Sequence, residues 1–406
     1  MGSVSDCRIV GAPPAALTFS TSVHRFFYNS AYFKELDITM TAPHRLSQDV
    51  LDATDAVVLV GGKGTRLRPL TLSAPKPMLP TAGLPFLTHL LSRIKDAGIK
   101  HIVLGTSYKA EVFSEYFGDG SDFGLEIEYV VEDQPLDTGG GIRNVLPKLR
   151  GENIMVFNGD VLGGTDLQDI LGTFVEKQAD VVLHLVQVPD PRAFGCVPTG
   201  ADGRVEAFLE KTPNPPTDQI NAGCYVFRRE IIESIPAGVP VSVERDVFPR
   251  LLEENRRMYG HVDSQYWRDM GTPQDFVQGS ADLVQGIAPS PALEGHQGEY
   301  LVLPGAEIAE SAILRGGTVI GQDSVVGDHA VVSSSVVFDG AVLGKDVVIE
   351  RSLVGNGARI GDGCVVRDAV IGDDAVVGDR CELVAGIRVW PGIEIPEAGV
   401  RFSTDA

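Results

Sequence analysis

The chain has few cysteines for its length. Five occur among 406 residues, and none form the CxxC pairs that are typical of redox and zinc sites. The eight histidines form neither an HxH nor an HExxH pattern. The sequence therefore gives no support to a disulfide framework or a zinc site, and it fits a reducing, cytoplasmic setting.

Basic residues are also scarce. Lys and Arg number 34 against 55 Asp and Glu, which gives a net charge of −21 and disfavours nucleic acid or an anionic membrane as a partner. No apolar run is long enough to span a membrane, and the N-terminus lacks the basic segment and apolar core of a secretory signal. A site for phosphate groups must therefore concentrate the few cations or recruit a metal. Lys63, Arg66 and Arg68 form such a group.

The length suits two domains with cores of their own. Residues 1–54 show no clear periodicity; we interpret them as an N-terminal extension, for which disorder is one reading. A first domain is expected at 55–285, a Pro- and Gly-containing linker at 286–300, a second domain at 301–399 and a short tail at 400–406.

Strand-like and helix-like segments alternate in the first domain. Apolar runs at 56–60, 101–104, 127–131, 154–157 and 181–188 predict buried strands, and segments with helical spacing lie between them. This alternation predicts a Rossmann-like α/β domain, a mostly parallel sheet with helices on both faces. Ligands then bind at the carboxyl ends of the strands, where the glycine-rich turn 61–64 and Asp160 are both expected.

The second domain carries a repeat of 17 residues. Aliphatic residues recur at spacings of six, six and five, at positions 320, 326, 332, 337, 343, 349, 354, 360, 366, 371, 377 and 383. Three short strands per turn, each with one inward aliphatic residue, would stack into a three-sided prism, with glycine at the corners where the backbone bends. The pattern resembles the hexapeptide-repeat left-handed β-helix. An antiparallel sandwich is the simpler alternative.

Residues 56–80, AVVLVGGKGTRLRPLTLSAPKPMLP, are the most informative segment. A strand leads into a glycine-rich turn that ends in Arg66, and Lys76 lies between two prolines. Such a turn exposes N–H groups that can hold phosphate oxygens, and the cations can neutralise charge in phosphoryl chemistry. The turn lacks the Gly-Lys-Ser/Thr of a Walker loop, and Leu67 replaces the third glycine of a dinucleotide fingerprint. A tight turn with two surface cations is the simpler alternative.

Two aspartates are further candidates for the phosphate site. Asp160 ends the motif FNGD, and Asp269 lies within YWRDMGTP. Two carboxylates that converge near a triphosphate could hold Mg²⁺, which prefers oxygen ligands. Aspartate after a strand is also a common helix cap or turn former, and the residues alone leave that alternative open.

The string GGxGTRLxPLT, followed by PKPM, resembles the signature of sugar-1-phosphate nucleotidyltransferases. The resemblance covers residues 55–399 and implies a nucleotidyltransferase domain followed by the β-helix. It implies that Arg66 and Lys76 are catalytic, on the leaving phosphates and the pentavalent phosphorus, and that Asp160 and Asp269 bind Mg²⁺. The residues it implies for nucleotide binding are Val60, Gly61, Gly62, Gly64, Thr65, Arg66, Lys76, Pro135, Thr138 and Gly139.

The same resemblance implies a sugar-phosphate site. Its residues would be Asn158, Gly159, Glu210, Lys211 and Asn221, with Lys211 on the phosphate and Glu210 and Asn221 on sugar hydroxyls. The loop 132–141 departs from the family pattern at two positions, because Asp137 stands where glycine is usual and Gly140 where alanine is usual. Aspartate tolerates positive φ better than most residues, and the geometry of this loop stays open.

The segments FLEKT, INAGCYVF, VSVERDVFP and YWRDMGTP resemble the branch that makes GDP-mannose and pyrophosphate from GTP and mannose 1-phosphate. The resemblance implies in-line attack at the α-phosphorus without a general base, because the attacking phosphate oxygen is already anionic. We expect a homo-oligomer, with the β-helix as its contact surface.

Three alternatives remain. The first is a glucose-1-phosphate nucleotidyltransferase that uses UTP, dTTP or ATP, since base selection depends on few groups, near 105–108 and Pro135. The second is a non-catalytic subunit that binds a nucleotide sugar, although no phosphate cation or metal aspartate is missing. The third is a β-helix with acyltransferase activity, but His329 is the only histidine in the counted coils.

Overall fold

The computed structural model describes residues 45–401 except 210–211, 294 and 296. Most of the expected N-terminal extension, up to residue 44, and residues 402–406 of the expected tail lie outside the described residues.

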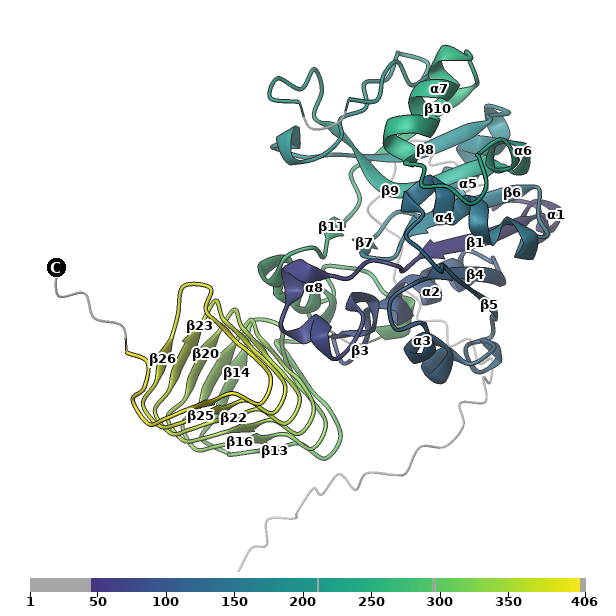
Figure 1. Ribbon diagram of the computed structural model, residues 1–406. Coiled ribbons are helices and arrows are strands. Elements are labelled where there is room, and N and C mark those ends of the chain that lie inside the picture. The colour runs from purple at the N-terminus through teal and green to yellow at the C-terminus, as the bar shows by residue number, and fades with distance from the viewer. Residues whose placement is uncertain (1–44, 210–211, 294, 296, 402–406) are drawn as a thin grey trace, which may run out of the picture. The chain divides into compact units, whose positions relative to one another are not determined.

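A seven-stranded sheet, in the order β10-β8-β9-β6-β1-β4-β5, forms the core of the N-terminal part (Figure 1). The strands are β1 (Thr54–Leu59), β4 (His101–Thr106), β5 (Glu126–Val131), β6 (Asn153–Asn158), β8 (Val181–Gln187), β9 (Gln219–Arg228) and β10 (Met258–Asp263). Only β9 runs against its neighbours, β6 and β8. The predicted mostly parallel α/β fold is confirmed, and the reversed strand β9 is an addition that the sequence pattern did not indicate.

Helices cover both faces of this sheet. Along β1, Ala56 and Val58 pack with α2 (Phe86–Asp96), α3 (Ala110–Phe117) and α5 (Leu167–Glu176), while Val57 packs with α4 (Asp137–Val145), α6 (Arg229–Glu233) and α7 (Phe248–Glu253). Alternate strand residues point to opposite faces, so one apolar run supplies two cores. The remaining helices are α1 (Gln48–Asp52) and α8 (Pro273–Val284). Among the described residues, no helix has the length and apolar character needed to cross a membrane.

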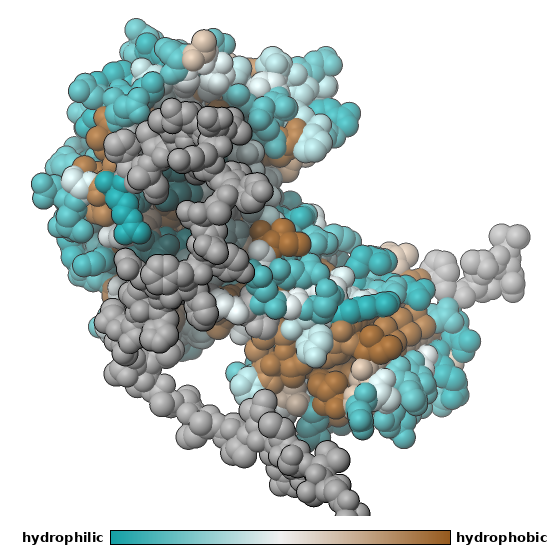
Figure 2. Space-filling model, turned by 180° about the vertical axis from the view of Figure 1, so that it is seen from behind, coloured by the Kyte–Doolittle hydropathy of each residue, from teal (hydrophilic) through white to brown (hydrophobic). Residues whose placement is uncertain are grey.

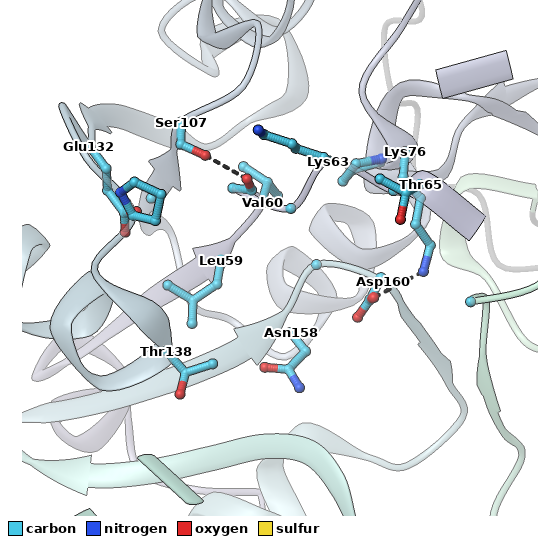
Figure 3. A pocket seen from close by; sticks show the side chains of 18 of the residues that line it. Leu59, Val60, Lys63, Thr65, Lys76, Ser107, Glu132, Thr138, Asn158 and Asp160 are labelled. Carbon is cyan, nitrogen blue, oxygen red and sulfur yellow. Dashed lines mark hydrogen bonds and ion pairs between the residues drawn. The ribbon is translucent and has the colours of Figure 1, made fainter. Parts of the chain in front are cut away.

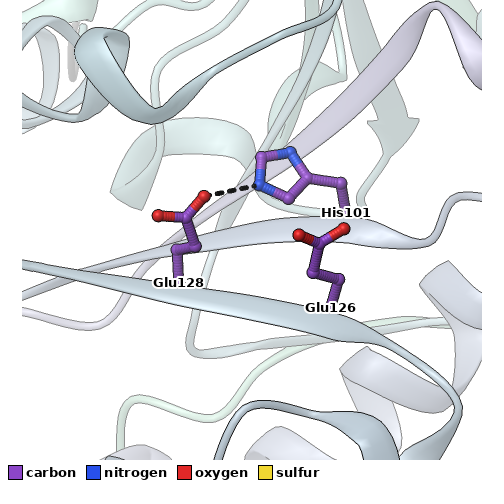
Figure 4. Close-up of side chains that lie close together, drawn as sticks. All are labelled: His101, Glu126 and Glu128. Atoms are coloured by element: carbon purple, nitrogen blue, oxygen red, sulfur yellow. Dashed lines mark hydrogen bonds and ion pairs between the residues drawn. The ribbon is translucent and has the colours of Figure 1, made fainter.

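An ion-pair network closes the amino-terminal edge of the sheet, opposite the cleft described below. The described residues contain one group of three side chains with metal-ligand character, His101, Glu126 and Glu128 (Figure 4). His101 Nδ1 lies 2.9 Å from Asp55 Oδ1, and its Nε2 lies 3.3 Å from Glu128 Oε1. Arg150 and a lysine neutralise the two glutamates in ion pairs of 2.6–2.9 Å. We therefore interpret the group as a structural staple, not a cation site.

This ion-pair network makes the stability of the folded protein depend on pH. The hydrogen bond to Asp55 raises the pKa of His101 in the folded protein despite the burial of the ring. The stabilisation that protonated His101 gives the folded state is therefore complete below the unfolded pKa of about 6.5, and it is lost as the pH rises through the higher folded-state pKa. His101→Asn keeps a neutral donor but removes the charge. We expect the variant to lose about 1 kcal/mol at pH 6, or about 2–4 °C in Tm, and less at pH 9. Thermal melts at both pH values test this, with the exposed His329→Asn as a control; a Tm difference that is the same at both pH values would contradict it.

The C-terminal part consists of three parallel sheets whose strands alternate along the chain (Figure 1). The first sheet contains β12 (Tyr300–Val302), β15 (Thr318–Ile320), β18 (Val336–Val337), β21 (Leu353–Val354), β24 (Val370–Ile371) and β27 (Arg388–Val389). The second contains β13 (Glu307–Ile308), β16 (Val325–Val326), β19 (Val342–Leu343), β22 (Arg359–Ile360), β25 (Val376–Val377) and β28 (Glu394–Ile395). The third contains β14 (Ile313–Arg315), β17 (Val331–Ser333), β20 (Val348–Glu350), β23 (Val365–Arg367) and β26 (Glu382–Leu383). All twelve aliphatic residues of the predicted 17-residue repeat are buried, so the predicted β-helix is confirmed.

Seven glycines lie at the corners of the repeat, directly after a strand, at positions 321, 327, 344, 355, 361, 372 and 378. None of the seven that follow the aliphatic residues has a positive φ. A Cβ on Gly321 would lie 2.4 Å from a backbone atom of the next coil, and one on Gly361 2.6 Å from the backbone nitrogen of Asp379. Positive φ at the bends is instead carried by other glycines and by residues such as Asp346 and Arg351. These glycines therefore lie at the corners, between a strand and the following turn, and they permit close stacking of coils there.

Candidate active site

The glycine-rich turn leaves β1 and folds back over β4. Ser107 Oγ donates a hydrogen bond to the carbonyl of Gly61 at 2.5 Å, and a Cβ on Gly61 would lie 2.9 Å from that hydroxyl. Gly64 has φ +56°, and a Cβ there would come within 3.0 Å of Lys76 and Thr71. Glycine is therefore needed at both positions, once for space and once also for conformation.

The turn forms one wall of a cleft of about 640 Å³ (Figure 3). Parallel strands end at one edge of a sheet, so the segments after β1, β4, β5 and β6 converge there. The expected site residues that line the cleft are Val60, Gly61, Gly62, Gly64, Thr65, Arg66, Lys76, Pro135, Thr138, Asn158, Gly159 and Asp160. Asp160 and the turn are a hundred residues apart in sequence, and the fold brings them to the same edge.

Lys76 lies between two carboxylates. Its side chain is buried, and Nζ is 2.9 Å from Asp160 Oδ2 and 3.9 Å from Asp269 Oδ1. Arg66 is exposed and reaches Asp269 Oδ2 at 4.0 Å. A short antiparallel ribbon holds the two aspartates together, because β11 (Trp267–Asp269) pairs with β7 (Val161–Gly163) and Met270 N donates to the Asp160 carbonyl at 3.0 Å.

Asp269 is the carboxylate of this group whose charge is least well stabilised. Burial and the neighbouring charge of Asp160 raise its pKa, and the two cations only partly offset them. Its Oδ1 is buried and has no hydrogen-bond partner. A buried carboxylate oxygen without a partner is costly, so this geometry suits a ligand that supplies positive charge.

The loop before α4 forms the opposite wall. Asp137 has φ +61°, the conformation that its replacement of glycine had suggested, and Oδ2 accepts a hydrogen bond from Arg245 at 2.6 Å. Gly140 packs against residue 239, where a Cβ would lie 2.7 Å from the carbonyl oxygen of Val239. Both departures from the family pattern are therefore accommodated locally. The helix α4 begins at Asp137 itself.

The expected sugar-phosphate residues are only partly placed. Glu210 and Lys211 lie outside the described residues. Asn221, on β9, donates from Nδ2 to Tyr225 Oη at 2.6 Å and accepts from Gly223 N at 3.0 Å, and it does not line the cleft. Gly139 is likewise buried beneath the loop, with its N–H on the Val241 carbonyl at 2.8 Å.

Several lining residues were not assigned to nucleotide, sugar-phosphate or metal binding, although Lys63 belonged to the expected cation group, and Gly105 and Ser107 to the segment 105–108 expected near the base. They are Leu59, Lys63, Pro77, Gly105, Ser107, Glu132, Asp137 and Gly271. Glu132 follows β5 directly. Because binding residues lie at the carboxyl ends of parallel strands, the argument that identified Asp160 would also have identified Glu132. A Cβ on Gly271 would lie 2.6 Å from the Arg66 guanidinium, which would then have to move aside, and no sequence signal indicates this contact.

Comparisons with known proteins identify the family of the chain. Residues 55–286 match the family described as "Nucleotidyl transferase", and residues 299–399 match "EIF2B subunit epsilon LbH domain". The chain is 66% identical to mannose-1-phosphate guanylyltransferase of Mycobacterium tuberculosis, over 86% of this chain and 98% of that protein. It is 32% identical to probable mannose-1-phosphate guanylyltransferase 2 of Arabidopsis thaliana, over 69% of this chain and 79% of that protein.

Among solved structures, HddC from Yersinia pseudotuberculosis complexed with GMP-PN is similar, with a TM-score of 0.50 and 29% identity over 56% of this chain and 99% of that one. The match over more than half of the chain, the shared fold and the cleft lead to one conclusion: the chain belongs to the nucleotidyl transferase family.

Proposed function

We propose that this protein is a mannose-1-phosphate guanylyltransferase, which makes GDP-mannose and pyrophosphate from GTP and mannose 1-phosphate. The observation that carries the proposal is the meeting of Arg66, Lys76 and Asp160 in one cleft, with Asp269 within 4.0 Å of both cations. The choice of substrates is supported by the mannose-1-phosphate guanylyltransferase of M. tuberculosis, almost the whole length of which is covered at 66% identity.

In this mechanism an oxygen of mannose 1-phosphate attacks the α-phosphorus of GTP. A new P–O bond forms, the bond from the α-phosphorus to the bridging oxygen breaks, and pyrophosphate takes the electron pair. Lys76 lies where it can neutralise charge on the pentavalent phosphorus, and the exposed Arg66 can follow the departing phosphates. The N–H groups of the glycine-rich turn hold the triphosphate in line.

The acidic pair fits Mg²⁺. Both aspartates offer hard oxygen ligands, and the orphaned Oδ1 of Asp269 is the group that a cation would satisfy. When bound, the ion would neutralise phosphate oxygens and stabilise the leaving group. Asp160 and Asp269 are the residues that we propose to hold it, on the β7–β11 ribbon.

Pyrophosphate release across a panel of substrates tests the function. GTP with mannose 1-phosphate should give the highest kcat/KM, above pairs of UTP, dTTP or ATP with glucose 1-phosphate. A preference for one of those pairs would support the alternative nucleotidyltransferase. Absence of turnover with every pair, together with retained nucleotide binding, would support a non-catalytic subunit.

We further propose that Glu132 selects guanine. Its carboxylate lines the cleft beyond the turn, and burial raises its pKa (Figure 3). Guanine presents N1–H and a 2-amino group side by side, and a carboxylate can accept from both.

Glu132→Gln should therefore lower kcat/KM for GTP about 10- to 100-fold. It should also reduce the preference for GTP over inosine triphosphate, which lacks the 2-amino group. The exposed Glu206→Gln is the matched control. An unchanged preference in Glu132→Gln would contradict this role.

The β-helix offers a surface for self-association. The outward positions of the third sheet form an aliphatic row of Ile313, Val331, Val348 and Val365, of which Ile313 is 52% exposed. Figure 2 shows hydrophobic side chains gathered over the β-helix. We propose that this row supports a homo-oligomer. Light scattering should show an oligomer for the wild type and a smaller species for Val348→Lys, and a monomeric wild type would contradict the proposal.

A further inference from the structure

The strand that carries Asp269 has two functional faces. Successive residues of a strand point to opposite sides. In β11, Asp269 faces Lys76 at the cleft, whereas Arg268 points away from it toward α8. The position of the carboxylate in the cleft therefore depends on what holds the far side of this three-residue strand.

A partly buried polar cluster holds that far side. Arg268 donates from Nε to Tyr266 Oη at 3.1 Å and from Nη1 to Asp275 Oδ1 at 3.2 Å, and its Nη2 lies 3.4 Å from Asp282 Oδ2. Tyr266 donates to the same Asp282 oxygen at 2.6 Å, and Gln278 donates to Oδ1 at 2.8 Å. Asp282 is only 4% exposed. Both acids belong to α8, so the cluster joins β11 to one rigid helix.

The opposite side of α8 rests on the β-helix. Its residues Phe276, Val277, Leu283 and Val284 share one apolar core with Val319, Val336, Leu353 and Val370 of the first β-helix sheet. At Gly317 the first full coil lies so close to the helix that a Cβ would be 2.6 Å from the Ala281 Cα. A third attachment is the hydrogen bond from Ala82 N to the buried Ser280 Oγ at 2.9 Å.

From this arrangement we infer that Arg268, Tyr266 and Asp282 are positioning residues for Asp269, and that α8 uses the β-helix as the support against which it holds the metal-binding carboxylate. The inference rests on the proposed role of Asp269 as a magnesium ligand. It assigns the β-helix a part in the geometry of the nucleotide site in addition to any role in self-association.

The test compares GTP affinity with and without the metal. Dissociation constants for GTP are measured by calorimetry in Mg²⁺ and in EDTA, and their ratio reports how well the protein uses the ion. Supporting groups of this kind typically change metal affinity 10- to 100-fold. We expect Asp282→Asn to reduce the ratio at least 10-fold and to leave the affinity in EDTA unchanged. Tyr266→Phe, which removes one hydroxyl and is the milder change, should shift the ratio in the same direction by about fivefold.

Asp180→Asn is the matched control. Asp180 is also 4% exposed and is also paired with an arginine, Arg257, at 2.9 Å, but it lies at the opposite edge of the sheet. It should lower stability and leave the ratio unchanged. Folded Asp282→Asn or Tyr266→Phe protein with the wild-type ratio would overturn the inference. A wild type whose GTP affinity does not respond to Mg²⁺ would instead overturn the metal assignment, and the inference with it.

Discussion

Lys76→Ala should lower kcat about 10²- to 10³-fold, the usual cost of removing one preorganised contact to a charged transition state. Lys76 is buried and lies between Asp160 and Asp269, so no mobile surface cation can take its place. Water that enters the vacated space would screen the developing charge less well. Single-turnover measurements of pyrophosphate release measure the effect on the chemical step directly.

Two further variants separate this role from a structural one. Lys76→Met fills a similar volume without charge and should lose as much activity as Lys76→Ala. Lys148→Ala breaks an ion pair of similar length, 2.8 Å to Glu128, at the far edge of the sheet and should retain activity. Near-normal turnover in folded Lys76→Met protein would remove Lys76 from the mechanism.

The sequence predicted those parts of the fold that repeat. The 17-residue period fixed the inward residues of the β-helix because each coil must bury one aliphatic residue per side, and the structure buries all twelve. The same pattern placed the glycines at the corners but did not indicate how closely the neighbouring coil approaches them, because that contact forms only on stacking. The reversed strand β9 was missed because the sequence pattern did not indicate a strand at 219–228, and its direction follows only from its pairing with Val156 and Leu183.

The site was predictable where position along a strand decides it. Turn residues and Asp160 follow strand ends, so parallel-sheet geometry predicts that they converge. Arg268 illustrates the limit, because its role depends on Tyr266 and on α8 residues that become its neighbours only after folding. Asn221 illustrates another limit, since its amide already bonds Tyr225 and Gly223 on its own strand.

The helix-capping interpretation of Asp160 does not fit its surroundings, because Asp160 lies in the turn between β6 and β7 and no α-helix follows it directly. An aspartate that caps a helix accepts a backbone N–H from the first turn, as Asp166 does from Gln168 at the start of α5. The side chain of Asp160 instead accepts a hydrogen bond from Lys76 and is 41% exposed toward the cleft. Asp160 therefore does not cap a helix, whereas Asp166 does, and the role of Asp160 as a metal ligand stays a prediction.

Because Asp160 lines the cleft and Asp166 caps a helix, only substitution of Asp160 should affect the use of Mg²⁺. Asp160→Asn keeps the shape of the side chain but removes the charge that would hold Mg²⁺, so kcat should fall about 10²- to 10³-fold, and more Mg²⁺ should be needed for half-maximal rate. Asp166→Asn is the matched control: asparagine caps a helix about as well as aspartate, so both activity and Mg²⁺ dependence should stay near wild type. Initial rates across a Mg²⁺ titration compare the two variants. Equal Mg²⁺ dependence in Asp160→Asn and wild type would mean that Asp160 only anchors Lys76, and the metal would then have to be held by Asp269 and the substrate phosphates alone.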